Sequence, residues 1–561
     1  MAKSTSNEIA EANVIHLPRD SIRKMSANTG VVNMAADAAR ATEFEHQMGL
    51  VQSLKVYRKG ALWSLALSTA IIMEGFDLIL LNSLFGFPSF KEKFGNLQPN
   101  GTYELTAAWQ TGLANGVLVG QIMGLFINGI IADRYGYRRT MGGALVLVTA
   151  FIFIPFFAHN VQTLLAGEIL LGIPFGIFQT LACTYASEVC PTQLRAYLTT
   201  YINLCWVIGQ ILASVILRAL VNRTDQWGYR IPFALQWFWP IPICLAVVFA
   251  PESPWWLVRR GCIKEARKSV ARLTSGKTNA EFNIDHTVAM MVYTDHLEKT
   301  VSAGTSYTDC FKGNDLRRTE IVCGVWACQV LCGSAYSGYS SYFFQQAGLD
   351  VSNAFTLTLA QYCIGAVGVL ASWFLMGWFG RRTLYLAGLA IMVVVLAIIG
   401  FAGLAGTSNI GAQWAIGSMI LVYTFVYDST VGPVCYALVS EIPSTRLKTK
   451  SVVLARNSYH ITGIVNNVIT PLMINPTAWN WGAKSGFFWA GSCALCFVWA
   501  YFRLPEPKGR TYGELDVLFD AKTPARKFKT ATVDGFITHD HAPPKGSTAQ
   551  NIEDIAVEKV V

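Results

Sequence analysis

The chain has 561 residues, of which 52% are hydrophobic and 14% charged, and its mean hydropathy is +0.37. A soluble globular protein carries about 25% charged residues, so this composition argues against a set of soluble domains and also excludes a disordered chain. Its 13 cysteines are too sparse for a disulfide framework. The formal net charge of +9 is expected to follow membrane topology rather than nucleic-acid binding.

Twelve stretches of the sequence are long and apolar enough to cross a bilayer, which takes about 20 mostly apolar residues. They group as six, then a polar stretch, then six. The sequence therefore predicts an all-α membrane protein whose twelve transmembrane helices form two six-helix bundles joined by a cytoplasmic helical linker. The expected spans are 61–82, 107–132, 140–158, 163–187, 197–219, 232–250, 320–343, 356–377, 384–405, 412–438, 449–473 and 482–502.

These spans divide the chain into five parts: an N-terminal tail (1–59), a first bundle (60–250), a linker (251–318), a second bundle (319–503) and a C-terminal tail (504–561). Lysine and arginine gather in the loops after the second, fourth, eighth and tenth spans and in the linker. Because cytoplasmic loops carry this excess, both termini are expected to be cytoplasmic. Asn100 and Asn222 then begin N-glycosylation sequons in external loops, although such triplets also arise by chance.

Three loop motifs occur twice at nearly one offset along the chain. Residues 129–139 are echoed by 377–382, residues 187–195 by 440–446, and residues 251–254 by 505–509. This duplication indicates two related bundles that face each other. Acidic and basic side chains in these loops are expected to latch the bundles in one state through breakable pairs, although basic loops can also do no more than fix topology. The candidate gating residues are Asp133, Arg134, Arg138, Glu188, Arg195, Arg381, Glu441 and Arg446.

The duplicated motifs resemble those of the sugar porter branch of the major facilitator superfamily, over residues 60 to 515. The motif at 129–139 is shared across that superfamily, whereas the Pro-Glu-Ser-Pro at 251–254 and the Pro-Glu-Pro-Lys-Gly-Arg-Thr at 505–511 are typical of sugar porters. Segments 73–81, 205–210, 332–339 and 454–457 narrow the resemblance to the fungal α-glucoside:proton symporters, the maltose permease group. The resemblance implies alternating access and proton-coupled sugar uptake across the plasma membrane, with no enzymatic activity.

Ionisable side chains inside predicted spans are costly there and indicate function by default. Glu74 and Asp77 lie three residues apart in the first span, and Arg456 lies in the eleventh. Burial favours the neutral form of a carboxyl group and a nearby arginine favours the ionised form, so such a site can bind and release a proton. We therefore expect Asp77 to carry the proton, Glu74 to be its partner and Arg456 to be the counter-charge. The alternative is a static buried salt bridge between these two spans.

The resemblance supports this assignment, because Asp77 matches a proton-coupling aspartate of symporting sugar porters. Bacterial relatives pair that aspartate with an arginine on the fourth span, where this chain has Glu168. The fungal group is thought to use two acids of the first span and an arginine of the eleventh. Glu168 also fits a simple interface residue, Asp428 fits a cavity lining or a helix cap, and His460 fits a packing residue or a proton ligand.

A sugar site needs amide or carboxylate groups for the hydroxyls and aromatic rings for stacking. Gln329 matches the first residue of the Gln-Gln pair found in sugar porters. Val330 and Ala335, by contrast, stand where hexose carriers have polar sugar-binding residues. These losses argue against an ordinary glucose carrier and suit a larger or differently oriented ligand. The candidate substrate-binding residues are Asn203, Gln210, Gln329, Tyr336, Tyr339, Tyr436 and Asn457.

The expected partners are a small sugar, a proton and the lipid bilayer, with no nucleic acid, metal or cofactor, and a monomer is the expected state. Two alternatives remain open. One is a carrier of another sugar, a polyol or a fungal metabolite. The other is a non-transporting sugar receptor, which the short C-terminal tail argues against. The exact substrate, the direction of transport and the proton stoichiometry are left open by the sequence.

Overall fold

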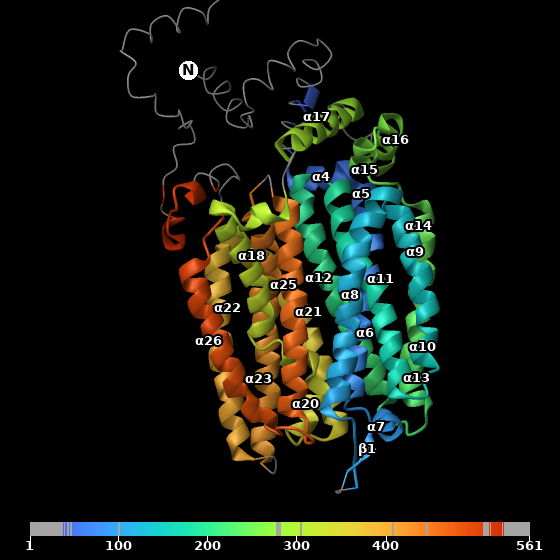
Figure 1. Ribbon diagram of the computed structural model, residues 1–561, viewed down its shortest axis with the longest axis vertical. Coiled ribbons are helices and arrows are strands. Elements are labelled where there is room, and N and C mark those ends of the chain that lie inside the picture. The colour runs from blue at the N-terminus through green and yellow to red at the C-terminus, as the bar shows by residue number, and fades with distance from the viewer. Residues whose placement is uncertain are drawn as a thin grey trace, which may run out of the picture.

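The computed structural model describes residues 48–98, 101–275, 282–302, 306–406, 409–444, 447–508 and 518–529, together with 37, 38, 40, 41, 44, 515 and 531. Long helices run side by side and form one elongated bundle in two halves (Figure 1). Among the described residues the only sheet is a two-stranded antiparallel hairpin of β1 (Asn96–Leu97) and β2 (Tyr103–Glu104), in which Asn96 is opposite Glu104. The hairpin lies at the end of the bundle opposite the linker helices (Figure 1).

The first half of the chain forms one group of membrane-length helices, several of them broken into shorter pieces. Its elements are α4 (Leu50–Val56), α5 (Arg58–Ser68), α6 (Ala70–Leu84), α7 (Pro88–Phe94), α8 (Ala107–Tyr135), α9 (Tyr137–Phe151), α10 (Phe153–Phe156), α11 (Val161–Val189), α12 (Thr192–Leu220), α13 (Trp227–Leu235), η1 (Gln236–Phe238) and α14 (Pro240–Phe249). The linker follows with α15 (Pro254–Arg259), α16 (Ile263–Leu273), α17 (Ile284–Ser302) and η2 (Tyr307–Phe311).

The second half repeats this arrangement. Its elements are α18 (Gly313–Leu331), α19 (Ala335–Gly338), α20 (Ser340–Gln346), α21 (Val351–Trp378), α22 (Arg381–Ala402), η3 (Gly403–Ala405), α23 (Ile410–Ser429), α24 (Val431–Glu441), α25 (Lys448–Ile474), η4 (Gly482–Ser485), α26 (Gly486–Arg503) and η5 (Ala525–Lys527). Asn222 is exposed just after α12, while Asn100, the other sequon asparagine, lies outside the described residues.

Ten helical segments in the described part of the chain are long and apolar enough to cross a membrane. The other two expected spans, 320–343 and 449–473, fall on α18 to α20 and on α25. The former begins with a charged turn and breaks at Gly333, whose φ is 98°, and the latter carries Arg456 and His460. Polar residues lower the hydropathy of these two segments, although both pack inside the second half.

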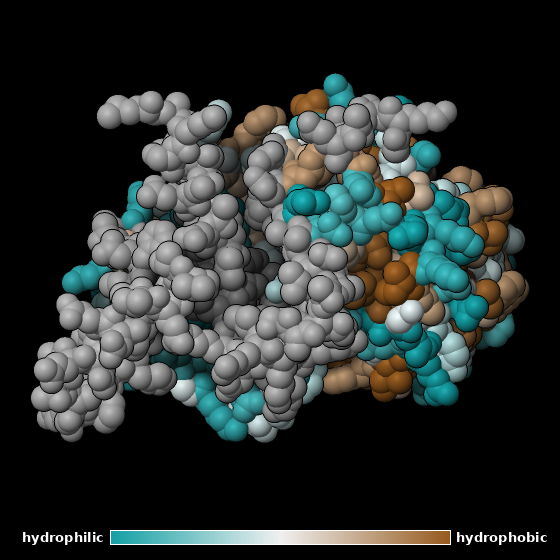
Figure 2. Space-filling view, turned by 90° about the horizontal axis from the view of Figure 1, so that it is seen from above, coloured by the Kyte–Doolittle hydropathy of each residue, from teal (hydrophilic) through white to brown (hydrophobic). Residues whose placement is uncertain are grey.

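Large apolar side chains cover the flanks of the bundle and are exposed there, such as Phe126, Ile130, Phe374 and Leu495. Seen from the end that carries the linker, hydrophilic side chains gather over the described linker helices and hydrophobic ones lie between and beside them (Figure 2). A soluble monomer rarely exposes so much contiguous apolar surface. In a bilayer that surface faces lipid tails, which agrees with an integral membrane protein.

Helices α8 and α11 cross at glycines, which let their backbones touch. A Cβ atom added at Gly120 would lie 2.1 Å from the carbonyl oxygen of Ile169, and one at Gly172 would lie 2.3 Å from that of Val117. Both distances are far below van der Waals contact. Any larger residue would therefore push these two helices apart.

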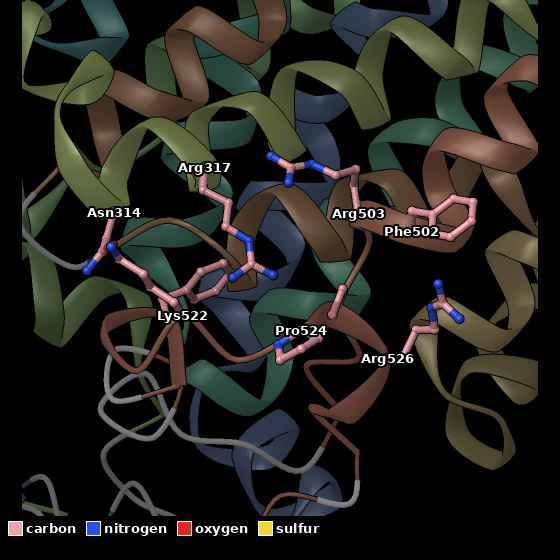
Figure 3. Close-up of a pocket in the computed structure, with 9 residues that line it drawn as sticks. Asn314, Arg317, Phe502, Arg503, Lys522, Pro524 and Arg526 are labelled. Carbon is pink, nitrogen blue, oxygen red and sulfur yellow. The ribbon is translucent and has the colours of Figure 1, made fainter.

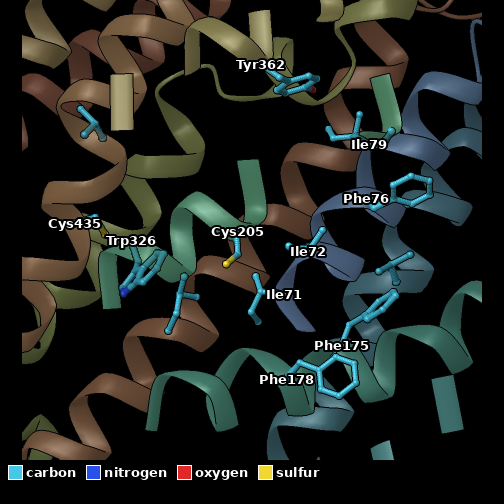
Figure 4. Packing of buried hydrophobic residues seen from close by; sticks show 14 of the residues in the cluster. Ile71, Ile72, Phe76, Ile79, Phe175, Phe178, Cys205, Trp326, Tyr362 and Cys435 are labelled. Carbon is cyan, nitrogen blue, oxygen red and sulfur yellow. The ribbon is translucent and has the colours of Figure 1, made fainter. Parts of the chain in front are cut away.

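Helices α6 and α12 also cross closely at glycines. A Cβ atom at Gly75 would lie 2.3 Å from the carbonyl oxygen of Trp206, and one at Gly209 would lie 2.3 Å from that of Ile72. Because Gly75 directly follows Glu74, this close crossing fixes the depth and direction of the acidic side chain. Apolar side chains from α6, α11 and α12 belong to the buried core of the bundle, including Ile71, Ile72, Phe76, Phe175, Phe178 and Cys205 (Figure 4).

The Gly120→Ala substitution should destabilise the folded protein by about 1–3 kcal/mol, because overpacking forces helices apart. Gly129→Ala is the matched control on the same helix, since a Cβ atom there would meet no atom within 4 Å. Melting temperatures of the two purified variants in detergent, followed by size-exclusion chromatography after heating, compare them directly. Equal melting temperatures would show that the α8–α11 crossing tolerates a methyl group.

Candidate functional site

Glu74 lies in α6 with 2% of its surface exposed. Its Oε1 atom accepts a hydrogen bond from Gln121 Nε2 of α8 at 3.1 Å and a second from Gln179 Nε2 of α11. Its Oε2 atom has no donor within the described residues. Two neutral amides rather than a directly bonded cation therefore hold this carboxyl group, and one of its oxygens stays available to a proton.

Arg456 reaches the same network from α25, in the other half of the molecule. Its Nε atom donates to Gln179 Oε1 at 3.3 Å. Its guanidinium carbon lies 4.7 Å from the ring centroids of both Trp326 and Tyr459, an arrangement that stabilises a cation. The amide of Gln179 thus bridges Glu74 and Arg456, and it connects the two halves of the bundle through hydrogen bonds alone.

Asp77 lies nearly one turn further along α6 and is fully buried. Its Oδ1 atom accepts a hydrogen bond from Gln236 Nε2 of η1 at 2.6 Å. Its carboxyl group also lies within hydrogen-bonding reach of Glu168 of α11, which is equally buried. Asp77 Oδ2 and both Glu168 oxygens lack a donor in the described structure. Two facing carboxylates repel strongly in such surroundings, so this pair is satisfied when it shares one proton.

Two further ionisable residues of the spans are buried beside other helices. His460, one turn along α25 from Arg456, is fully buried, and neither ring nitrogen has a partner among the described residues. Asp428 of α23 faces α21, where a Cβ atom at Gly365 would lie 2.6 Å from its Oδ2 atom. The glycine therefore lets α21 approach a buried carboxyl group.

Among the expected substrate residues, two have their polar groups engaged within the second half. Gln329 Nε2 donates to the carbonyl oxygen of Gly432 at 3.1 Å. The Tyr336 hydroxyl hydrogen-bonds with Ser485 Oγ at 2.7 Å, and the whole side chain is buried. In this conformation both residues support helix packing, and their sugar-binding role stays a prediction.

Of the remaining expected substrate residues, Tyr339 is buried and its hydroxyl has no partner within the described residues, whereas the other four are more accessible. Asn203 and Gln210 of α12 and Tyr436 and Asn457 of α24 and α25 are only partly buried. The Nδ2 atom of Asn203 has no acceptor within the described residues, and Tyr436 packs edge-on against Trp326 with ring centroids 4.9 Å apart. These side chains thus offer free amide groups and aromatic faces beside Arg456.

At the end opposite the linker, contacts between the two halves form an outer seal that the sequence did not predict. Lys91 of α7 pairs with Glu104 of β2 at 2.6 Å, and its ammonium group lies 5.5 Å from the ring centroid of Tyr342 of α20. The Lys91 and Glu104 side chains are only 15% and 8% exposed. Further contacts of the outer seal are Gln345 Nε2 to Gly86 O at 2.9 Å, Asn475 Nδ2 to Leu105 O at 2.8 Å, and Tyr339 stacked on Phe85.

At the linker end, the duplicated motifs form the same structure twice. Glu252 accepts hydrogen bonds from the first two backbone N–H groups of α9, at 2.9 and 3.3 Å, and Glu506 does so for α22, at 2.9 and 3.1 Å. Arg138 and Arg382 then donate to carbonyl groups at the ends of α14 and α26. A carboxylate at a helix N-terminus satisfies donors that the helix leaves unpaired.

Three of the expected gating residues form two ion pairs, one between the first half and the linker and one within the second half. Glu188 of α11 pairs with Arg259 of α15 at 2.7 Å, and Arg381 of α22 pairs with Glu441 of α24 at 2.9 Å. Burial lowers the pKa of Arg259, but the Glu188 carboxylate more than offsets this and raises it above its ordinary value. Neither pair joins the two halves, so a latch between the halves stays a prediction.

The other candidate gating residues are distributed around these pairs. The main-chain carbonyl groups of Asp133 and Arg134 accept hydrogen bonds from Trp256 Nε1 at 3.0 Å and from Arg260 Nη2 at 2.5 Å, which ties the end of α8 to α15. The side chain of Arg195 and the whole of Arg446 lie outside the described residues.

Comparison with known proteins identifies the family. The family described as "Sugar (and other) transporter" matches residues 63–519. The chain belongs to this family. It is therefore a transporter and not an enzyme, and the predicted relation to sugar porters is confirmed.

Two named relatives have a sequence identity to this chain that is high enough to indicate clear homology. The chain is 44% identical over 509 residues to the general alpha-glucoside permease of Saccharomyces cerevisiae, covering 90% of this chain and 82% of that protein. It is 43% identical over 524 residues to the maltose permease MAL31 of the same organism, covering 92% and 84%.

Solved structures show the same fold at low sequence identity. The proton:xylose symporter XylE, of the major facilitator superfamily, superposes with a TM-score of 0.65 at 19% identity, covering 82% of this chain and 98% of that one. The partially occluded inward-open conformation of XylE from E. coli gives a TM-score of 0.64, also at 19% identity, covering 80% and 98%. The prediction of an all-α membrane protein with this fold is confirmed.

Lys91→Met should destabilise the closed outer seal by about 3–5 kcal/mol, because it leaves the buried Glu104 carboxylate unpaired. The double variant Lys91→Met with Glu104→Leu should recover most of that loss, since it removes both charges together. Thermal melting of wild type, single and double variants in detergent measures the effect. A double variant no more stable than the single one would show that the ion pair does not carry the outer seal.

Proposed function

We propose that the protein imports an α-glucoside such as maltose together with a proton, by alternating access across the plasma membrane, with both termini cytoplasmic. The observation that carries the proposal is the bridge from Glu74 through Gln179 to Arg456, which joins the two halves next to a second buried acidic pair. The names of the yeast relatives and their identity of 44% and 43% support the choice of cargo.

The bridge suits coupling because it links a charge to the relative position of the halves. While the halves are joined at this depth, Glu74 receives two amide hydrogen bonds and interacts with the charge of Arg456, which favours its ionised form. When the halves separate there, Arg456 withdraws from Gln179. The carboxyl group then loses the neighbouring positive charge that favoured its ionised form, so its affinity for a proton rises.

The Asp77 and Glu168 pair extends this mechanism within the first half. Asp77 was expected to carry the proton with Glu74 as its partner, and the contact with Glu168 supports a different pairing. We assign one shared proton to Asp77 and Glu168. Glu74 is assigned a separate role, in which its ionisation depends on how near Arg456 lies. Gln236 orients Asp77 by donating to its Oδ1 atom, which leaves Oδ2 for the shared proton.

The sugar is assigned to the partly accessible polar side chains beside this network. Asn203 offers an unpaired amide donor, and Tyr436, which packs against Trp326, offers a partly exposed aromatic ring. Amide donors match sugar hydroxyls and aromatic rings match the apolar faces of the sugar ring. A sugar bound beside this network would interact with the groups that gain and lose the proton. Symport requires such coupling between the two binding events.

Expression in a yeast strain without its own disaccharide carriers tests the function. Adding maltose to unbuffered cells should cause accumulation of labelled maltose together with a rise in external pH, because protons enter with the sugar. A panel of other sugars and polyols added to the same cells defines the cargo. Uptake without a pH change would exclude proton coupling, and no uptake of any compound by protein shown at the plasma membrane would exclude transport of this class.

The Glu168→Gln variant tests the acidic pair. Its amide would donate to Asp77 and favour the ionised carboxylate, so proton-driven maltose accumulation should fall by about tenfold or more and require a more acidic medium. Exchange of labelled for unlabelled maltose needs no net proton movement and should continue. Glu265→Gln, which removes an exposed acid of α16, is the control and should behave as wild type. Normal accumulation by Glu168→Gln would remove Glu168 from the mechanism.

A further inference from the structure

A cavity of about 430 Å³ opens at the linker end of the second half, away from the proposed transport site (Figure 3). It lies between the start of α18, the end of α26 and the segment that follows α26. Its lining includes Asn314, Arg317, Phe502, Arg503, Lys522 and Arg526, and none of its lining residues is acidic. Its volume falls in the range of ordinary ligand pockets, roughly 300–1,000 Å³.

The four cations of the cavity are not neutralised to the same extent. Arg503 forms a two-pronged ion pair with Glu320, so its charge is largely compensated. Arg317 donates from Nη1 to the carbonyl oxygen of Thr523 at 2.9 Å, but its Nε atom is buried without an acceptor within the described structure. An unpaired buried donor of a charged group is costly, and it indicates a missing acceptor.

The other two cations are exposed at the rim. The guanidinium carbon of Arg526 lies 4.8 Å from the ring centroid of Tyr501 and 4.7 Å from that of Phe502, which holds it in place and leaves its donors outward. Lys522 is exposed as well, and no carboxylate in the described part of the chain pairs with either residue. The cavity therefore presents positive charge that the described residues do not balance.

One wall of the cavity belongs to the C-terminal segment, which is firmly packed. Phe519 and Phe528 are buried with ring centroids 5.1 Å apart, and the guanidinium carbon of Arg318 lies 4.4 Å from the Phe519 ring centroid. Asn314 Nδ2 donates to Asp520 Oδ1 at 2.8 Å. The cations are thus held on a fixed scaffold rather than on a loose tail.

The cavity lies where the apolar flank of the bundle gives way to its polar end. Phe502, next to Arg503, and Leu495, about two turns earlier in α26, are 54% and 73% exposed on the flank. The charged headgroups of lipids occupy this level of a bilayer, and basic pockets at the cytoplasmic side bind their phosphates. The location therefore favours a ligand supplied by the membrane.

We propose that this cavity binds a phosphomonoester anion, with a phosphorylated lipid headgroup as the source. Guanidinium groups match phosphate oxygens with two parallel hydrogen bonds, and an ammonium group adds a third charged contact. The phosphate would lie between Arg317, Arg526 and Lys522. Its charge would also relieve the repulsion between Arg317 and Arg503 and so hold the C-terminal segment against α18.

Binding to the purified full chain in neutral detergent tests the proposal. The probes are dioctanoyl phosphatidylinositol 4-phosphate, inositol 1,4-bisphosphate and inorganic phosphate, with dioctanoyl phosphatidylcholine as the uncharged comparison, and the readouts are a binding isotherm and the melting temperature. Wild type should bind the phosphorylated lipid saturably and melt at a higher temperature with it. The double variant Lys522→Gln with Arg526→Gln should bind at least about tenfold more weakly.

The double variant Lys264→Gln with Lys268→Gln is the matched control, because it removes the same charge from exposed positions of α16. It should bind the lipid as wild type does. Saturable binding of the lipid alone supports a membrane source, and equal binding of inositol 1,4-bisphosphate supports the same site with a soluble source. Absence of saturable binding, or equal weakening in both double variants, would overturn the proposal. Unliganded melting temperatures of both variants close to wild type exclude unfolding as the cause.

Discussion

A carboxyl group in the middle of an apolar bundle needs polar partners, and this requirement fixes the centre of the molecule. Glu74 and Asp77 are both buried in α6, and each obtains a hydrogen bond from a glutamine of another helix. One of these glutamines, Gln179, also accepts a hydrogen bond from Arg456 of the second half. The positions of α11, of η1 and of α25 around α6 therefore all depend on satisfying two acidic side chains.

Close helix crossings make that arrangement possible. The glycines at positions 75 and 209 let α12 touch α6, and those at 120 and 172 let α11 touch α8. Since Gly75 follows Glu74 and Gln121 follows Gly120, each crossing point stands next to a member of the polar network. The hydrogen bonds of the network join α6 to α8 and to α11, so the crossings position its members. Packing and polar contacts thus support each other in the same few turns.

The sequence was sufficient for the fold and for the identity of the charged residues at the centre. Spans are defined by local composition, and an ionisable residue inside a span is visible without any structure. The partners were not visible, because Gln236 and Asp77 are separated by 159 positions and only the fold brings them together. The outer seal was missed for the same reason, since Lys91, Glu104 and Tyr342 come from three separate elements. The duplicated loop motifs were recognised, yet their ion pairs brace each half and their glutamates cap helices.

The contacts between the halves are of a kind that can break. At the centre they include the hydrogen bonds of one amide, and at the outer end they include the cation–π contact of Lys91 with Tyr342 and a few side-chain hydrogen bonds to backbone carbonyl groups. A typical hydrogen bond contributes about 0.5–1.5 kcal/mol net, so a small set of them is comparable to the binding energy of a sugar. Within each half, by contrast, backbones touch at glycines and buried glutamates cap helix ends. Alternating access requires rigid halves joined by weak contacts. Binding of substrate and proton is then sufficient to shift the equilibrium between two arrangements of the halves.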